Sequence, residues 1–200
     1  MVESTDLRVV RSRKLIEQAL TDILSNQGIK ELSVKNLSQK AGINRGTFYL
    51  HYKDIFDLIE QTEWMRGLLE IFKPIRLSDL MKHSDEKSPF PAIAEAFQYL
   101  QRHASLFKAI FHPSAPAELR ERLQYLVGKR LYESLQQEHP NSNWSVQPAG
   151  YIIAYLGSGQ FGLIQHWFMT DRTLPPDEIA LMLTRFIRNS PCLSHYYGGS

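Results

Sequence analysis

Residues 41–54 read AGINRGTFYLHYKD and gather two glycines, two cations, a histidine and two tyrosines on one short stretch. Asn44 is a preferred N-cap residue, and Gly42 is a preferred stop for a helix that ends just before it. Ile43 and Phe48 have the spacing of a hydrophobic staple around the Asn44 cap. The stretch therefore predicts a turn followed by a short helix that carries many polar side chains.

A second helix is predicted directly before this turn. Ser33 is its expected N-cap, Leu32 and Leu37 have the staple spacing, and Gly42 ends it. Two capped helices with a glycine at the corner make a helix-turn-helix. Further upstream, apolar residues at helical spacing predict another helix that stops near Gly28. Those apolar residues are Leu15, Ile16, Ala19, Leu20, Ile23 and Leu24.

The second helix of a helix-turn-helix enters the DNA major groove, and its N-terminal residues reach the base edges. Arg45 has the fork of donors that reads a guanine, and Gly46 permits a close backbone approach. Phe48 and Tyr52 are expected to turn inward and hold the helix on its neighbours. The candidate DNA contacts in this pattern are Lys35, Arg45, Gly46, Thr47, Tyr49, His51 and Lys53.

The charge distribution agrees with a polyanionic partner at one end of the chain. Through Lys53 there are nine Lys and Arg against five Asp and Glu, a balance of 9 − 5 = +4, while the whole chain carries +2. The remaining residues therefore carry −2, which makes the N-terminal quarter the basic part. Helix-turn-helix geometry also occurs in helical adaptors that do not bind DNA, so that alternative stays open at this point.

Composition predicts a cytosolic globular protein without a metal or cofactor. Apolar residues make up 43% and charged residues 22% of the chain, with no apolar run of membrane-spanning length and no signal segment. Cys192 is the single cysteine, and the seven histidines show no i, i+4 pair, so no metal site is expected. Catalytic residues are not expected either.

The rest of the chain also reads as helical. A longer helix, residues 54–72, is expected to start at the N-cap Asp54, and Lys73–Pro89 is expected to be a linker with one short helical turn. Prolines at first-turn positions mark several later helices. The expected later helices are Pro91–Phe111, Pro116–Glu138, Gln147–Met169 and Pro176–Arg188.

A competing interpretation arises at Gly157–Gly162, GSGQFG, which matches the G-x-G-x-x-G dinucleotide-binding fingerprint. It would make the protein a small nucleotide-dependent enzyme that uses Gly157, Gly159 and Gly162. The fingerprint needs a parallel sheet, however, and no alternating series of strands and helices precedes it. The favoured interpretation places these glycines on a helix, where they let a neighbouring helix come close.

From Arg11 to Leu58 the chain resembles the DNA-binding domain of the TetR (tetracycline-repressor) family of bacterial transcription regulators. The resemblance is carried by LIEQAL, by GIKELSVKNLSQKAGINRGTFYLHYKD and by Leu58. It departs from the family where Asn36 replaces an acidic residue and Ile55 replaces a lysine. The resemblance implies base or groove contacts for Lys35, Arg45, Gly46 and Tyr49, with His51 as a further candidate, and phosphate contacts for Ser33 and Thr47.

The resemblance also implies an organisation for the whole chain. Residues 1–53 would form the DNA-binding domain and residues 54–200 a dimerisation and effector-response domain, joined by the helix 54–72. The protein would be a homodimeric repressor that leaves its near-palindromic operator when a small apolar effector or a protein partner binds. Its last two long helices would form the dimer interface through Tyr151, Tyr155, Gly159, Gly162, Leu163, Trp167, Leu183 and Phe186.

Overall fold

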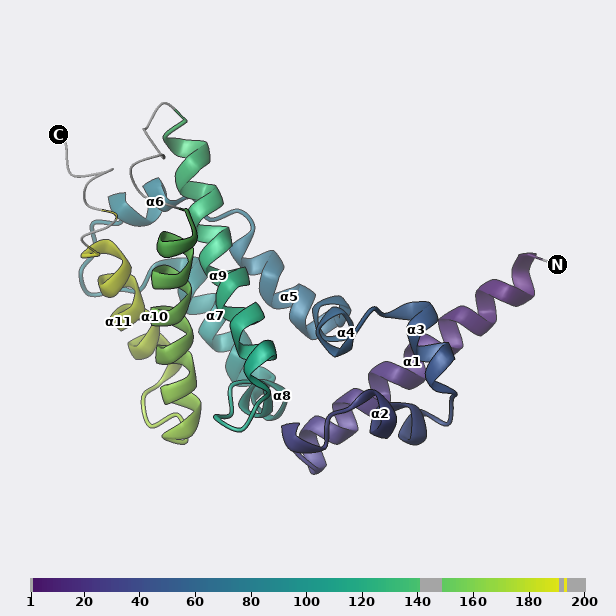
Figure 1. Cartoon of the computed structure of the whole chain (residues 1–200). Helices are drawn as coiled ribbons and strands as arrows, with labels where there is room; N and C mark the ends of the chain where they lie inside the picture. The colour runs from purple at the N-terminus through teal and green to yellow at the C-terminus, as the bar shows by residue number, and fades with distance from the viewer. Residues whose placement is uncertain (1, 141–148, 191–192, 194–200) are drawn as a thin grey trace.

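The computed structural model describes residues 2–140, 149–190 and 193, and every regular element within them is a helix (Figure 1). The all-α prediction is therefore confirmed. Figure 1 shows two parts: a head built around α1–α3 and a body in which the later helices pack side by side. None of the described helices combines the length and apolar character needed to span a bilayer.

Local sequence explains the helix ends of the head. Gly28 and Gly42 have φ of 86° and 67°, a left-handed conformation that favours glycine, and each follows the end of a helix. The Ser33 hydroxyl accepts a hydrogen bond from Asn36 N (3.1 Å), which confirms it as an N-cap. Asn44 occupies the N-cap position of the next helix without a side-chain capping bond. The elements of the head are α1 (Val2–Asn26), a 3-10 turn (Ile29–Glu31), α2 (Val34–Ala41) and α3 (Arg45–His51).

The expected helix 54–72 is broken, which corrects the prediction of one connecting helix. The structure has α4 (Ile55–Gln61) and α5 (Glu63–Phe72), separated at Thr62. Thr62 has an extended ψ of 152°, and its hydroxyl donates to Ile59 O (2.6 Å) and accepts from Met65 N (3.4 Å). The sequence did not reveal this break, because the break takes up only one residue and the helical spacing of apolar residues continues on both sides of it.

The body follows the predicted order with one further break. The expected helix Pro91–Phe111 is two helices that meet at His103, so the prediction of one element was wrong there. The predicted start at Gln147 lies outside the described residues. The observed helices are α6 (Leu77–Lys82), α7 (Pro91–Arg102), α8 (Ala104–Ile110), α9 (Ala117–Glu138), α10 (Ala149–Met169) and α11 (Pro176–Arg188).

The body contains an unusually close pair of helices, α9 and α10, which lie side by side in Figure 1. At their crossing, a Cβ on Gly157 would collide with the backbone carbonyl of Gln124, and one on Gly128 would collide with that of Ile153. The G-x-G-x-x-G stretch therefore lies inside α10, and no strand exists among the described residues. The nucleotide-binding interpretation requires a sheet and is therefore not supported. Gly157 instead allows the close contact between α10 and α9 within the chain.

Candidate nucleic-acid interface

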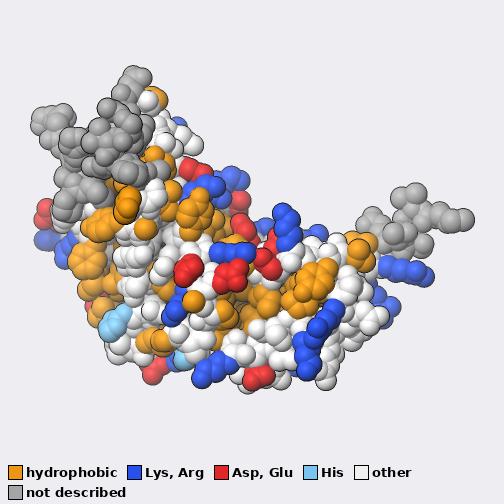
Figure 2. Space-filling view, in the orientation of Figure 1, with side chains coloured by type: hydrophobic (Ala, Val, Ile, Leu, Met, Phe, Trp, Pro, Cys, Tyr) orange, Lys and Arg blue, Asp and Glu red, His pale blue; other side chains and the backbone are white. Residues whose placement is uncertain are grey.

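Helix α3 separates into an inward and an outward face. Phe48 and Tyr52 are at most 1% exposed and pack in the core of the head, as the sequence predicted. Arg45, Gly46 and Tyr49 lie on the opposite face and are exposed to solvent. Lys and Arg side chains lie along the lower and outer edge of the head in the view of Figure 2. The short helix is therefore anchored by its aromatic residues and presents its polar residues outward.

Side-chain hydrogen bonds fix the end of α3 to α1 and tie α1 to α4. His51 Nε2 lies 2.7 Å from Ser12 Oγ on α1, and the Tyr52 hydroxyl donates to Glu17 Oε1 at 3.1 Å. Arg13 donates to the Tyr52 hydroxyl (3.4 Å) and, through Nη2, to Gln61 Oε1 of α4 (2.6 Å). These bonds hold the outward face of α3 at a defined angle to the rest of the head.

Two of these groups have pKa values shifted by their surroundings. Burial lowers the pKa of His51, and the neighbouring positive charge of Arg13 lowers it further. Burial raises the pKa of Tyr52 above its ordinary value. Both side chains are therefore held in their uncharged forms near neutral pH, and His51 Nε2 bonds to α1. This engagement makes His51 a residue that positions α3, in addition to its predicted role as a DNA contact.

The start of α2 supplies a second group of candidate contacts. Lys35 is exposed in the first turn, while Ser33 is half-buried with its hydroxyl capping the helix. Asn36 donates through Nδ2 to the backbone carbonyl of Glu31 (2.8 Å), so the residue that departs from the family pattern has a structural role. Thr47 of α3 is half-buried. The predicted set thus comes from two places, the start of α2 and the outward face of α3.

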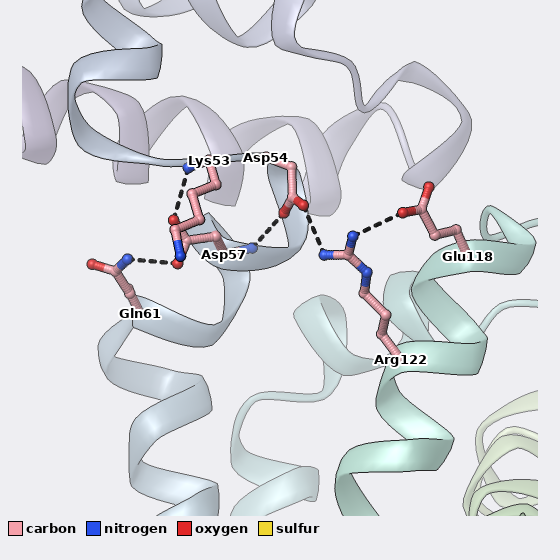
Figure 3. A network of polar contacts seen from close by, with 6 residues as sticks. All are labelled: Lys53, Asp54, Asp57, Gln61, Glu118 and Arg122. Atoms are coloured by element: carbon pink, nitrogen blue, oxygen red, sulfur yellow. Dashed lines mark hydrogen bonds and ion pairs between the residues drawn. The ribbon is translucent and has the colours of Figure 1, made fainter.

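The segment directly after α3 carries a polar network that reaches the body (Figure 3). Lys53 N donates to Asp57 Oδ2 and Asp57 N donates to Asp54 Oδ1, both at 2.8 Å. Arg122 of α9 donates through Nη1 to Asp54 Oδ2 (2.7 Å) and through Nη2 to Glu118 Oε1 (2.9 Å). The N-cap residue of α4 is therefore bonded both to its own helix and to a helix of the body.

The electrostatics of this network favour its charged forms. Partial desolvation opposes ionisation of Asp54, but hydrogen bonds from Asp57 N and Arg122 outweigh it and lower the pKa of the Asp54 carboxyl. The same bond raises the pKa of Arg122. The Arg122 guanidinium also lies 5.2 Å from the centre of the Phe56 ring. Asp54 and Arg122 therefore form a charged link between head and body at neutral pH.

Sequence reasoning missed two residues of this region. Leu50 is 83% exposed, more than any other large apolar side chain among the described residues. Its spacing, four residues after Gly46 and three before Lys53, places it on the outward face and could have revealed it. Arg122 was missed because its partner is 68 residues away in sequence. No local pattern connects the two.

Tyr49 and Lys53 also border a crevice between head and body. The crevice has a volume of about 230 Å³ and is walled on the other side by Pro116, Leu119 and Arg122. Tyr49 nevertheless keeps 58% of its surface exposed. The outward face of α3 is therefore open to solvent, with one edge close to the beginning of α9.

The predicted dimer-interface residues fall into two groups. Trp167 and Leu183 are 2% and 5% exposed within the single chain, so their prediction as partner contacts was wrong. The Trp167 indole donates to Leu174 O (2.9 Å) and packs edge-on against Phe97, which explains its burial. The others lie at or near the surface of α10 and α11. Those are Tyr151, Tyr155, Gly159, Gly162, the half-buried Leu163 and Phe186.

The helices of the body enclose an apolar cavity of about 100 Å³. Its walls come from all the helices from α5 to α11 and include Leu69, Phe97, Leu126 and Phe161. Three buried phenylalanines of the body, Phe97, Phe107 and Phe111, line it. Among the described residues, no three His, Cys, Asp or Glu side chains gather as a metal site would require.

Comparison with known proteins identifies the family. Residues 87–189 match the model of a TetR transcriptional regulator C-terminal region, which is about half of the chain. An uncharacterized HTH-type transcriptional regulator of Bacillus subtilis (strain 168), YxbF, is 30% identical over 90 residues, 44% of this chain. The matched part spans 23% of that protein's length.

Two solved structures resemble the whole chain. A TetR-family transcriptional regulator from Streptomyces coelicolor has a TM-score of 0.51 and 16% identity, covering 93% of this chain and 82% of its own. NalD, the secondary repressor of the MexAB-OprM multidrug efflux pump in Pseudomonas aeruginosa, has a TM-score of 0.50 and 19% identity, covering 88% and 94%. At these identities the likeness concerns the fold. Together with the family match, it shows that the chain belongs to the TetR family of transcriptional regulators.

Proposed function

We propose that this regulator binds a near-palindromic DNA operator as a homodimer, represses transcription there, and is released when a small effector binds in its body. Residues 1–53 would form the DNA-binding domain and residues 54–200 the dimerisation and effector-response domain. The proposal rests chiefly on one observation, the outward face of α3, where Arg45, Gly46 and Tyr49 are exposed, with the exposed Lys53 two residues after the helix.

Several details of that face support DNA as its partner. A Cβ on Gly46 would meet nothing within 4 Å, so no packing inside the protein requires a glycine there. A closely approaching phosphate backbone would require one. Arg45 at the first position of α3 has no partner among the described residues, which leaves its guanidinium available to a guanine edge. Lys53 and Lys35 supply charge for phosphate contacts.

The exposed face of α10 and α11 supports the proposal of a homodimer. Tyr151 and Tyr155 of α10 and Phe186 of α11 are 79%, 58% and 60% exposed, which is unusual for large aromatic side chains. Gly159 and Gly162 have open space around them, so a second chain could approach α10 closely. In Figure 2 hydrophobic side chains gather over the part of the body where α9 and α10 face the viewer. Aromatic residues are enriched in protein interfaces.

Helix α9 offers a route from an effector to the head. It lines the apolar cavity through Leu123, Leu126 and Val127, and directly before Leu123 it carries Arg122, the partner of Asp54. An effector that shifts α9 would therefore displace the start of α4, directly after α3. If the effector prefers the arrangement with the wrong spacing between the two heads, operator affinity falls.

Selection of bound duplexes from a random pool tests the proposed function. We expect a symmetric consensus whose half-sites are about 34–36 Å apart or a multiple of that distance, because each chain presents one α3. Binding should weaken steeply as salt rises, since phosphate contacts release counterions. A helical adaptor without DNA binding would yield no consensus and no salt-sensitive affinity for any duplex, and that result would refute the proposal.

A further inference from the structure

A second cavity lies against the apolar one and differs from it in chemistry. It has a volume of about 830 Å³ and is lined by residues of α6, of the end of α9 and of the segment that follows α5. Four of its lining residues are cations and two are carboxylates, so its formal balance is 4 − 2 = +2. Residues 54–200 as a whole carry −2. The cations are Lys73, Arg76, Lys82 and Arg130, and the carboxylates are Glu133 and Glu138.

The two carboxylates of this cavity are already engaged by the protein. Glu138 accepts hydrogen bonds from the backbone N–H groups of Leu77 and Ser78, each at 2.7 Å, and so caps the start of α6. Glu133 lies 3.7 Å from the ammonium of Lys129, which is outside the cavity. Both keep their negative charge, and the formal balance of +2 already includes them.

Three of the cations have no such partner. Lys73 pairs with Glu70 at 3.2 Å, but Arg76, Lys82 and Arg130 form no ion pair with any residue that the structure describes. Unpaired cations on an open surface are usually only solvated. These three are also exposed to solvent, but they line one hollow, so their potentials add on whatever occupies it.

The two cavities share a wall formed by Phe72, Ile75, Arg130 and Ser134. Arg130 is therefore the cation that reaches both the cationic space and the apolar space. An arginine can lay its methylene groups along apolar side chains while its guanidinium binds an anion in two parallel hydrogen bonds. The junction thus has the properties of a site that binds an apolar chain with an anionic end.

We propose that the ligand of the body is an apolar compound that ends in an anionic group, with its apolar part among the core helices and its anion against Arg130, assisted by Arg76 and Lys82. This inference rests on the proposed function only in naming the ligand as the effector. A neutral apolar compound would fill the small cavity of about 100 Å³ but would leave the cations without a counter-charge. A compound with an anionic end satisfies both spaces at once.

The test compares one alkyl chain with different end groups. Hexanoate, octanoate, decanoate and octyl phosphate are titrated into the full-length protein by calorimetry, beside octanol and octyltrimethylammonium, without DNA. We expect the carboxylates or the phosphate ester to bind at least about 10-fold more tightly than octanol, because a charged hydrogen bond at Arg130 is lost with the alcohol. Whichever anion binds more tightly identifies the end group.

Two variants of α9 locate the effect. Arg130→Gln should weaken the anionic compounds about 10- to 100-fold and leave octanol unchanged. Arg120→Gln removes the same charge from another position of α9, outside both cavities, and should change neither. Equal binding of octanol and octanoate, an unchanged anion affinity in Arg130→Gln, or no binding by any anionic compound up to its solubility limit would each overturn the inference.

The same compounds are then added to the complex with the selected duplex. Ligand binding without any DNA binding would refute the proposed function and leave the ligand site standing. Operator binding with no affinity for any anionic compound would refute the ligand site and leave the proposed function standing. Release of the duplex by the anion, and its absence in Arg130→Gln, would support both.

Discussion

The head and the body of this chain use their apolar residues in opposite ways. In the head, Ile16, Leu20, Leu37 and Phe48 are fully buried, and they fix one short helix so that its other face is presented outward. In the body, Phe97, Phe107 and Ile110 are buried just as completely, yet they border an empty space of about 100 Å³. The head therefore holds one conformation for an external partner, whereas the body keeps an internal cavity that can hold a ligand.

The prediction with the largest expected effect concerns the crossing of α9 and α10 in the body. Gly157→Val should reduce the free energy of unfolding by about 3 kcal/mol, because its side chain would collide with the backbone of α9, which cannot move aside like a flexible side chain. Urea unfolding followed by circular dichroism at a fixed protein concentration measures the loss. Gly150→Val is the matched control, since a Cβ there meets nothing within 4 Å. Equal stability of the two variants would mean that α9 and α10 are not in close contact.

The next test concerns the outward face of the head. Arg45→Ala should weaken binding to the selected operator by about 1–3 kcal/mol, as expected when a bidentate base contact is lost. Its stability should not change, because Arg45 is exposed and unpaired in the described structure. Arg66→Ala, which removes an exposed arginine from α5, is the control. Fluorescence anisotropy measures the affinity for the operator. If both substitutions weaken binding equally, Arg45 contributes only its positive charge and makes no specific base contact.

The junction between the two parts gives a smaller effect that depends on pH. Asp54→Ala should cost about 1 kcal/mol of stability at pH 7 through loss of the N-cap of α4. Asp54→Asn keeps a capping oxygen but loses the charged bond to Arg122, so the difference between the two variants isolates the cap.

The sign of the pH dependence follows from the lowered pKa of Asp54. Its contribution to stability should be fully present above the pKa of an unfolded aspartate, about 3.9, and should disappear as pH falls through the lower folded value. Urea unfolding at several pH values between 2 and 7 checks this. If Asp54→Asn and the wild type lose stability in parallel across that range, the charged link contributes nothing.

The smallest expected effect concerns Leu50. If α3 enters the major groove as proposed, the exposed Leu50 would contact the 5-methyl group of a thymine, so Leu50→Ala should weaken operator binding by about 2- to 5-fold. Replacing thymine by uracil at each position of the half-site should weaken the wild type at one position and leave Leu50→Ala unaffected there. A uniform response of both proteins at every position would exclude this contact.

The same contrast explains how much could be predicted from sequence. In the head, the caps at Ser33, Gly28 and Gly42 and the inward positions Phe48 and Tyr52 all follow from neighbours within a few residues. Local patterns predict such features well because the physical causes are themselves local. The outward set on α3 was predictable for the same reason, apart from Leu50.

The body was less predictable because its decisive contacts are distant in sequence. Apolar spacing marks Trp167 and Leu183 as buried, but it cannot tell whether their partner is the same chain or another. The helix ends at Thr62 and His103 were missed because the apolar spacing continues across both positions. The shared wall around Arg130 joins segments about 60 residues apart, and the link from Arg122 to Asp54 spans 68 residues. These features exist only once the chain has folded.

The break between α4 and α5 consists of a single residue, Thr62. It is 2% exposed, and its hydroxyl serves the end of α4 and the start of α5 at the same time. The angle between α4 and α5 therefore depends on the hydrogen bonds of one small side chain, in addition to the Asp54–Arg122 bond at the start of α4. In a paired molecule, this would let the reach between two DNA half-sites change by substitution at position 62, while every residue that touches a base stays the same. Half-site spacing and base preference could then diverge independently among related regulators.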